Sequence, residues 1–105
     1  MELELYWTRL AENKLDDIFN YYETTVNLST AKKLVTGIIN KTIETESNLY
    51  IGQKELLLEK YKQEFRYLVY KNYKIIYWIN FDKKRIEIAN VFDTRQSPNK
   101  MDEIN

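Results

Sequence analysis

Carboxylates, lysines, arginines, tyrosines and hydroxyl groups are the only side chains in this sequence that could carry out acid–base or nucleophilic chemistry. The 105 residues include no cysteine and no histidine. Histidine is the commonest general base and metal ligand, and thiolate sites and disulfides need cysteine. The sequence therefore excludes disulfides and thiolate metal sites, and we expect no metal and no other cofactor.

The basic groups gather in the second half of the chain. The sequence has 16 basic and 16 acidic residues, so its net charge is zero. Residues 1–49 hold five Lys/Arg and eight Asp/Glu, for −3, and residues 50–105 hold eleven and eight, for +3. A basic half can face a nucleic acid or an acidic protein surface, and a charge of +3 does not decide between them.

The length fits one small domain, because a chain of 105 residues leaves little room for a second hydrophobic core. We expect this domain to span residues 1–98 and residues 99–105 to form a polar C-terminal tail that frays. The N-terminus lacks the basic and apolar runs of a signal peptide, and no apolar run approaches the ~20 residues of a membrane helix. We therefore expect a cytoplasmic protein with no membrane partner, which agrees with the absence of cysteine.

The first half of the chain has the pattern of a short strand followed by two helices. Over residues 3–7, the apolar side chains of Leu3, Leu5 and Trp7 alternate with those of Glu4 and Tyr6, as in a strand with one buried face. Apolar residues then recur at helical spacing over residues 9–25, and again to about residue 46. Thr8 can cap the first helix and Ser29 the second, because a hydroxyl oxygen there accepts a hydrogen bond from the first turn. The short link between the helices predicts an antiparallel hairpin.

After Gly52 the apolar spacing changes to two residues, which is typical of strands. Leu56 and Leu58 predict one strand that ends near Tyr61. Three further strands are expected at residues 65–70, 73–79 and 85–92.

The turn between the strands at 65–70 and 73–79 is predicted at Lys71 and Asn72, because asparagine tolerates a positive φ. The middle strands are apolar on both faces, so both faces of the sheet must be covered. The expected class is α+β with the order β-α-α-β-β-β-β. Its N-terminal helical hairpin packs on a mostly antiparallel, twisted sheet.

Three segments of the second half resemble motifs of the RelE/ParE toxin superfamily. They are residues 65–70 (FRYLVY), 72–77 (NYKIIY) and 91–98 (VFDTRQSP). Trp7-Thr8, the helical hairpin and Gly52 look like the same family, so the resemblance covers nearly the whole chain. The resemblance implies the fold above, neutralisation by a cognate antitoxin, a toxin–antitoxin hetero-oligomer, and a target in translation or replication.

The resemblance leaves three functions open. The two helices, about 17 and 18 residues by their spacing, resemble the ParE-like branch, whose members poison DNA gyrase. RelE-like members instead cut messenger RNA in the ribosome, which would make this chain an enzyme. The third function is a non-toxic module that binds an antitoxin and regulates its own operon. We favour the first, a growth-inhibiting toxin of the kind linked to plasmid stabilisation.

If the chain is a nuclease, the resemblance implies that Arg66, Lys74 and Arg95 surround the scissile phosphate. Cationic groups would offset the charge that develops there, and one group must take the proton of the 2′-hydroxyl. Arg66 and Lys74 share a hairpin, so we expect them to be cross-strand neighbours. Asp93 could serve as the base, although an aspartate with an ordinary pKa is a weak one.

Two departures from the RelE pattern argue against efficient cleavage of RNA. Leu68 stands where RelE has a second lysine. Residues 93–96 (DTRQ) stand where many relatives have His-x-Arg-Arg. A carboxylate at position 93 would also oppose the binding of a phosphate.

The same residues have structural interpretations. Arg66 and Lys74 can be solvated strand residues, or they can form ion pairs with Glu64 or Glu87. The acidic and basic residues of segment 93–96 can form a structural salt bridge. The tyrosines of the strands can be core residues instead of a stacking platform for bases.

The resemblance finally implies that an antitoxin segment lies over the sheet and the helices and buries apolar surface. The candidate contacts are Tyr73, Tyr77, Trp78, Phe81 and Phe92. If these side chains are accessible, the isolated toxin exposes a sticky patch.

Overall fold

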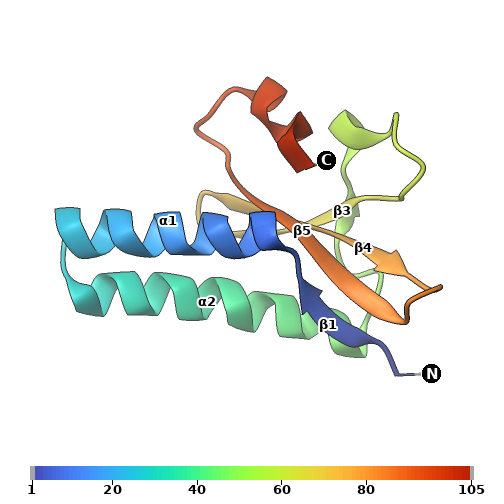
Figure 1. Ribbon diagram of the computed structural model, residues 1–105, viewed down its shortest axis with the longest axis horizontal. Coiled ribbons are helices and arrows are strands. Elements are labelled where there is room, and N and C mark those ends of the chain that lie inside the picture. The colour runs from blue at the N-terminus through green and yellow to red at the C-terminus, as the bar shows by residue number, and fades with distance from the viewer. Residues whose placement is uncertain (1, 105) are drawn as a thin grey trace.

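A helical hairpin lies against a five-stranded sheet (Figure 1). The computed structural model describes residues 2–104, with the side chains of residues 2–101. The helices and strands, in chain order, are β1 (Glu4–Trp7), α1 (Arg9–Thr25), α2 (Leu28–Ser47), β2 (Gln53–Lys54), β3 (Arg66–Tyr70), β4 (Tyr73–Asn80) and β5 (Arg85–Asp93). Two 3-10 helices are added to these, η1 (Leu56–Leu58) and η2 (Pro98–Ile104). Within this described part of the chain, no helix has the length and apolar character needed to span a bilayer.

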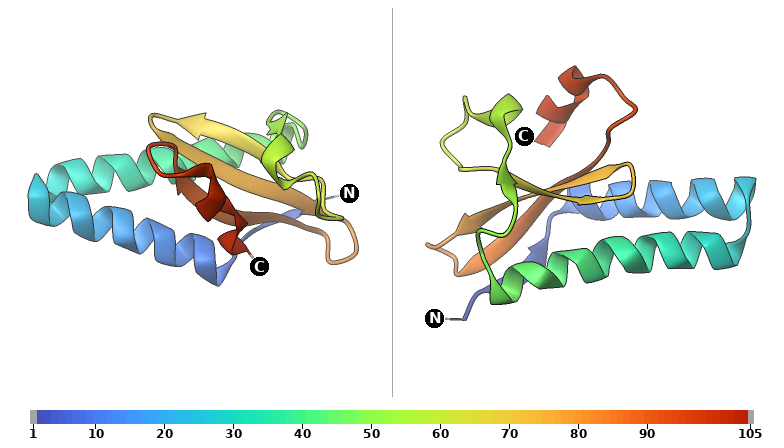
Figure 2. Two further views of the ribbon diagram at one scale, coloured as in Figure 1. Left: turned by 90° about the horizontal axis from the view of Figure 1, so that it is seen from above. Right: turned by 180° about the vertical axis from the view of Figure 1, so that it is seen from behind.

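The first and last strands of the sequence are neighbours in the sheet, whose order is β1-β5-β4-β3-β2. β1 pairs with β5 in parallel, and the other neighbouring strands are antiparallel. Figure 2 shows from two further sides how the strands twist across the hairpin. The predicted α+β class and the order β-α-α-β-β-β-β are confirmed.

Helix α1 begins where the sequence predicts, at a threonine cap. Thr8 Oγ1 accepts a hydrogen bond from the Ala11 N–H at 3.2 Å. The same hydroxyl donates to the Ile88 carbonyl at 2.9 Å, so the cap also fixes the start of α1 on β5.

Helix α2 begins earlier than expected. Asn27 Oδ1 accepts a hydrogen bond from the Thr30 N–H at 2.8 Å, which makes Asn27 the cap. The prediction of Ser29 as the cap was wrong. An asparagine caps a helix as well as a serine does, and here it comes first in the chain.

Residues 56–58 form η1, so the strand predicted at Leu56 and Leu58 was wrong. Glu55 Oε1 accepts a hydrogen bond from the Leu57 N–H at 3.2 Å and starts this turn. Leu58 is fully buried while the other two leucines are exposed. Three consecutive leucines fit several spacings, and the strand that the topology requires is the short β2, just before them.

The turn between β3 and β4 lies at Lys71 and Asn72, as predicted. The residue with a positive φ is Lys71, at 53°, and not Asn72. Lys84, with φ of 55°, has the same conformation in the turn before β5. Both lysines therefore adopt a left-handed conformation in which a side chain with Cβ is disfavoured.

One core fills the space between the helical hairpin and the sheet. Its fully buried side chains come from both helices and from the two central strands: Ala11, Ile38, Ile75, Tyr77, Ile86 and Ile88. The alternation of these positions on the strands fixes which side chains face the helices.

A second, smaller core covers the opposite face of the sheet, as the two-sided apolar pattern predicted. Its buried members are Leu58, Phe65, Ile76, Ala89, Phe92 and Met101. The segments that carry η1 and η2 lie together over this face, away from the helices (Figure 1). Met101 is 2% exposed, so the C-terminal segment is packed at this residue, contrary to the expectation that it frays. The division of the chain at residue 98 stays a prediction.

Candidate functional site

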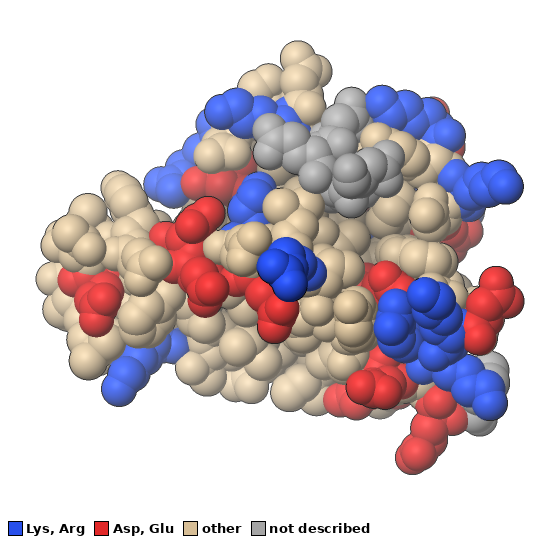
Figure 3. Space-filling view, viewed as in Figure 1, with Lys and Arg blue, Asp and Glu red and all other residues tan. Residues whose placement is uncertain are grey.

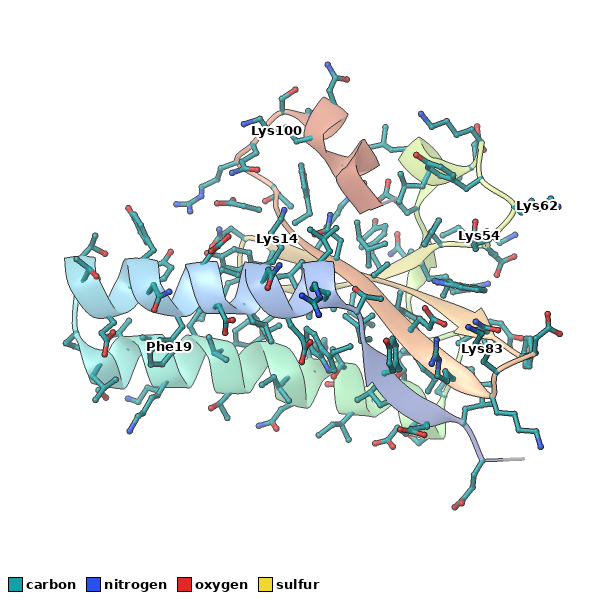
Figure 4. The ribbon with its side chains drawn as sticks, in the orientation of Figure 1. Lys14, Phe19, Lys54, Lys62, Lys83 and Lys100 are labelled. Atoms are coloured by element: carbon teal, nitrogen blue, oxygen red, sulfur yellow. The ribbon has the colours of Figure 1, made fainter. Side chains whose placement is uncertain are left out.

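A cleft of ≈ 570 Å³ opens between α1 and the end of β5. Helix α1 supplies Lys14, Asp17, Ile18, Tyr21 and Tyr22, and the sheet and C-terminal segment supply Tyr73, Val91, Asp93, Arg95, Gln96 and Lys100. Figure 4 shows the two lysines that line it, Lys14 on α1 and Lys100 on the C-terminal segment. The cleft thus carries charges of both signs beside tyrosines.

Asp93 and Arg95 form a two-pronged ion pair at this cleft. Arg95 Nη2 lies 2.8 Å from Asp93 Oδ2, and Arg95 Nε donates to Asp93 Oδ1 at 3.0 Å. Asn72 Nδ2 donates to the same oxygen, Oδ1, at 3.1 Å. Hydrogen bonds from Arg95 lower the pKa of Asp93 to about 2. Asp93 is therefore a poorer general base than an ordinary aspartate.

Tyr73 lies in the wall of the cleft, and its side chain is almost fully buried. Burial, followed by a hydrogen bond with Tyr22, raises the pKa of Tyr73 to about 12. The phenol is therefore neutral at physiological pH and can donate a proton in a hydrogen bond but not act as an anionic base.

Arg66 is the first residue of β3. It lies next to β2, at the end of the β3–β4 strand hairpin that is far from the turn at Lys71 and Asn72. Its guanidinium donates to the Gly52 carbonyl at 2.7 Å and lies 2.8 Å from Glu64 Oε2. It also stacks over the ring of Tyr50, with 4.9 Å between the guanidinium carbon and the ring centre. The hydrogen bond from Arg66 lowers the pKa of Glu64. The alternative interpretation of Arg66 as an ion-pair partner of Glu64 is confirmed.

Lys74 lies on the opposite face of the sheet. Its Nζ is 2.8 Å from Glu55 Oε2, and only 3% of the Glu55 side chain is exposed. The same ammonium lies 4.2 Å from the ring centre of Tyr67. Lys74 therefore neutralises a buried carboxylate next to η1, and this partner is neither of the two acids expected from the sequence.

The structure does not bring the three predicted cations together. Arg66 is the register partner of Tyr77, which faces the helices, whereas Lys74 pairs with Val69 and with Phe92 of the second core. The expectation that Arg66 and Lys74 are cross-strand neighbours was therefore wrong, because their positions point to opposite faces. Arg95 lies beyond the end of β5, at the cleft beside α1.

The five aromatic residues proposed as antitoxin contacts are divided between core and surface. Tyr73, Tyr77 and Phe92 are at most 3% exposed, and they belong to the two cores. Trp78 is partly buried against the second core, and Phe81, in the turn before β5, is 49% exposed. Antitoxin contact stays a prediction, and of the five only Trp78 and Phe81 present surface to a partner in this conformation.

A second hollow, which we call the hairpin groove, has a volume of ≈ 660 Å³. Its apolar lining comes from β1 and both helices: Trp7, Leu15, Phe19, Val35 and Ile39. Its polar lining consists of Arg9, Glu12, Asn13 and Asp16, all on α1. The sequence analysis gave this groove no role. The sequence does contain a pattern that indicates this groove. Glu12 and Asp16 are one helical turn apart, and so are the neighbouring apolar residues Leu15 and Phe19.

No group of three or more acidic side chains that could hold a metal ion occurs among the side chains described, those of residues 2–101. The site residues described above form two clefts, and they supply ion pairs and hydrogen-bonding groups. The three predicted cations do not face a common point, so they do not form a single cluster around one phosphate.

The sequence matches a family model described as "ParE toxin of type II toxin-antitoxin system, parDE" over residues 5–98. The chain belongs to this ParE toxin family. Among solved structures, it is similar to a chain of "Chromosomal ParDE TA system from P. aeruginosa", with a TM-score of 0.72 and 20% identity. The match covers 88% of this ParE-family chain and 96% of the other, and at this identity it supports the fold. No curated protein sequence matches the chain.

The Asp93–Arg95 pair of this ParE-family toxin gives a testable pH dependence. Because the folded-state pKa of Asp93, about 2, lies below the ordinary value of 3.8, its carboxylate stabilises the fold above roughly pH 4. That contribution is lost as the pH falls through the folded-state pKa. Arg95 is well exposed, so screening by solvent keeps the contribution small.

We expect Asp93→Asn to be less stable than the parent at pH 7, and we expect this difference to shrink below about pH 4 until little of it is left at pH 2, as measured by urea unfolding across this range. Asp82→Asn is the control, because Asp82 is exposed and forms no ion pair with any side chain from residue 2 to residue 101. A constant difference between Asp93→Asn and the parent from pH 7 to pH 2 would contradict the ion-pair explanation.

Proposed function

We propose that this chain is the growth-inhibiting toxin of a type II pair, that it interferes with DNA gyrase by protein–protein contact, and that a cognate antitoxin neutralises it. The observation that carries the proposal is the family match over residues 5–98. The helices of 17 and 20 residues are consistent with it, since the long hairpin was the feature that favoured the ParE-like branch.

The nuclease alternative receives less support from the site. Arg66, Lys74 and Arg95 each have a carboxylate partner at 2.8 Å, so each charge is already neutralised within the chain. Metal-free cleavage of RNA needs cations that converge on one phosphate and a group that takes the 2′-hydroxyl proton. The pKa of about 2 for Asp93 weakens the one acidic candidate for that step.

The direct test is a supercoiling assay with purified toxin and purified gyrase. We expect the toxin to inhibit supercoiling, and we expect the protein encoded by the adjoining antitoxin gene to restore it when added in equal amount. In cells, inducible expression should arrest growth with a DNA-damage response while protein synthesis continues at first.

The same expression experiment separates the alternatives. Rapid arrest of translation with cleaved messenger RNA, and loss of both effects in Arg95→Ala, would favour the nuclease. Arg95 is the suitable position, because 62% of its side chain is exposed and its replacement leaves both cores intact. Expression without growth arrest would favour the non-toxic regulatory module, and unaffected supercoiling would contradict the gyrase proposal.

A further inference from the structure

The polar lining of the cleft between α1 and the end of β5 consists mainly of hydrogen-bond donors. The volume of this cleft, ≈ 570 Å³, lies within the range of about 300–1,000 Å³ in which small-molecule sites are found. Its apolar lining is formed by Ile18 and Val91, which are both buried. The polar side chains therefore decide which ligand the cleft fits, and the proposed function, which requires only contact between proteins, gives them no role.

Two lysines at this cleft carry charges that no carboxylate of the described chain neutralises. Lys14, on α1, is partly buried, and Lys100, on the C-terminal segment, is exposed. Neither forms an ion pair with any side chain between residues 2 and 101. Figure 4 shows Lys14 on the side of α1 toward Lys100, and Figure 3 shows basic side chains in this part of the surface. A ligand in the cleft therefore meets two ammonium groups that are free to bind it.

The carboxylate of Asp93 does not cancel these two charges, because its oxygens are already bound. Oδ1 accepts hydrogen bonds from Asn72 Nδ2 at 3.1 Å and from the backbone N–H of Arg95 at 2.9 Å, and Oδ2 lies 2.8 Å from Arg95 Nη2. The Asp93–Arg95 pair is therefore close to neutral as a unit. Of the other charged groups that line the cleft, two are the lysines and one is Asp17, which leaves a charge of +1.

The phenols of Tyr22 and Tyr73 extend this hydrogen-bonded network to α1. Burial, followed by a hydrogen bond with Tyr22, raises the pKa of Tyr73, and Asp93, followed by Tyr22, raises the pKa of Arg95. An arginine can only donate, and the raised pKa of Tyr73 marks this phenol as the donor in its bond with Tyr22. The Tyr22 oxygen therefore accepts from both neighbours, and its own proton is available to a ligand. Such a cleft fits a ligand that is rich in hydrogen-bond acceptors.

Tyr21 adds an exposed aromatic ring to the lining of the cleft. Its side chain is 58% exposed, and its ring stands edge-to-face against Tyr22 with 5.1 Å between the ring centres. An exposed tyrosine ring can stack on a flat heterocycle such as a nucleobase. Asp17, which is exposed and has no ion-pair partner among the side chains of residues 2–101, can accept a hydrogen bond from a hydroxyl or amino group of the same ligand.

We propose that this cleft binds a nucleotide, with its phosphate between Lys14 and Lys100 and its base against Tyr21. A phosphate supplies the acceptors that ammonium and phenol donors require, and a sugar hydroxyl or a base amino group supplies the donor for Asp17. The nucleotide is either free or one unit of a nucleic-acid strand, because both present the same groups. This inference goes beyond the proposed function, since inhibition of gyrase by protein contact needs no such site.

The test titrates the purified toxin with two probes, ADP by isothermal calorimetry and a fluorescein-labelled single-stranded oligothymidine by fluorescence anisotropy. We expect the parent to bind at least one of them, and binding to weaken as salt is added. In Lys14→Gln/Lys100→Gln we expect the dissociation constant to rise on the order of tenfold, because a hydrogen bond to a charged group contributes about this factor. The matched control is Lys62→Gln/Lys83→Gln, which removes the same charge at exposed positions outside the cleft and should bind as the parent does.

The contact with the base is tested separately. Tyr21→Leu removes the exposed ring, and we expect it to weaken binding of the nucleotide probe while binding of inorganic pyrophosphate, which has no base, stays as in the parent. Phe81→Leu removes an exposed ring that does not line the cleft, and it should leave binding of both probes unchanged. Circular dichroism and thermal unfolding confirm that each variant is folded.

Two results support the inference and identify the source of the nucleotide. Binding of ADP that the oligonucleotide does not displace indicates a free nucleotide, and binding of the oligonucleotide at least as tight as that of ADP indicates a strand. In both cases Lys14→Gln/Lys100→Gln must bind more weakly than the parent.

Four results would overturn the inference. They are binding of neither probe at millimolar concentration, equal binding by the parent and Lys14→Gln/Lys100→Gln, displacement of the probes by a polyglutamate peptide at the same concentration, and binding of pyrophosphate as tight as that of ADP. The third would identify an acidic protein segment as the occupant, and the fourth a general anion site. The supercoiling assay is independent of all four, so the proposed function stands or fails separately.

Discussion

Replacing Lys74 by methionine is expected to lower the free energy of unfolding by about 3–5 kcal/mol, because it leaves a buried carboxylate without a counter-ion. Glu55 is 4% exposed, and its Oε2 lies 2.8 Å from Lys74 Nζ. The methionine keeps the length and the apolar stem of the lysine, so the variant removes the charge with little loss of packing. Urea unfolding at pH 7 measures the difference.

The double variant Glu55→Gln/Lys74→Met is the decisive control for this prediction. A glutamine at position 55 keeps an oxygen for the hydrogen bond from the Leu57 N–H, while the unpaired charge is gone. We expect it to recover most of the lost stability, because replacing both members of a buried pair is far less harmful than removing one. Glu55→Gln alone should have a smaller effect than Lys74→Met, since the Lys74 side chain is 22% exposed and can reach water. A Lys74→Met variant as stable as the parent would show that Glu55 is hydrated in solution.

Gly52→Ala is the second substitution with a large expected effect, because the added Cβ has no space. It would lie 2.7 Å from the Tyr67 carbonyl oxygen and 2.7 Å from Cε1 of Tyr77, a fully buried ring. The Gly52 N–H also donates to Tyr77 Oη at 2.9 Å, so a shift of the loop disturbs that bond. Overpacking of this kind lowers the free energy of unfolding by about 1–3 kcal/mol, and we expect the upper part of that range.

Gly37→Ala in α2 is the matched control for Gly52→Ala. The Cβ there would meet the far end of the Tyr70 side chain, which is half-buried and can turn aside. Alanine also stabilises a helix interior by about 1 kcal/mol relative to glycine, which offsets the adjustment. A change close to zero at Gly37 with a loss at Gly52 would support this account, measured by urea unfolding. Equal stability of the parent and Gly52→Ala would contradict it.

The helices and the four longer strands could be predicted from the sequence, because their apolar spacing extends over several repeats. The bounds of α1 at Arg9 and Thr25 agree with the prediction. The errors occur where the pattern is shorter than one repeat. A run of three leucines at 56–58 has no period of its own, and β2 has only two residues. Met101 lies in a polar segment, so its burial depends on tertiary packing that no local pattern reports.

The sequence was sufficient to predict that Arg66 and Lys74 lie on opposite faces of the sheet, but not to predict the partner of Lys74. A two-residue turn at 71–72 sets Tyr70 opposite Tyr73, and counting back along both strands sets Arg66 opposite Tyr77. That register already separates Arg66 from Lys74, and the error lay in treating residues of one hairpin as neighbours. The partner of Lys74 could not be predicted, because Glu55 reaches it from a segment 19 residues away, through η1.

The parallel pairing of β1 with β5 affects how this protein folds during its synthesis. The hydrogen bond between Thr8 and Ile88 joins residues 80 positions apart, whereas the helical hairpin forms from neighbours in the chain. Long-range pairing of this kind slows folding, because the closure of a long loop precedes any gain from the contacts. We therefore expect β5 to join the sheet late in folding, when it pairs between β1 and β4. A nascent chain that stops before Arg85 lacks β5, the strand with which both β1 and β4 pair.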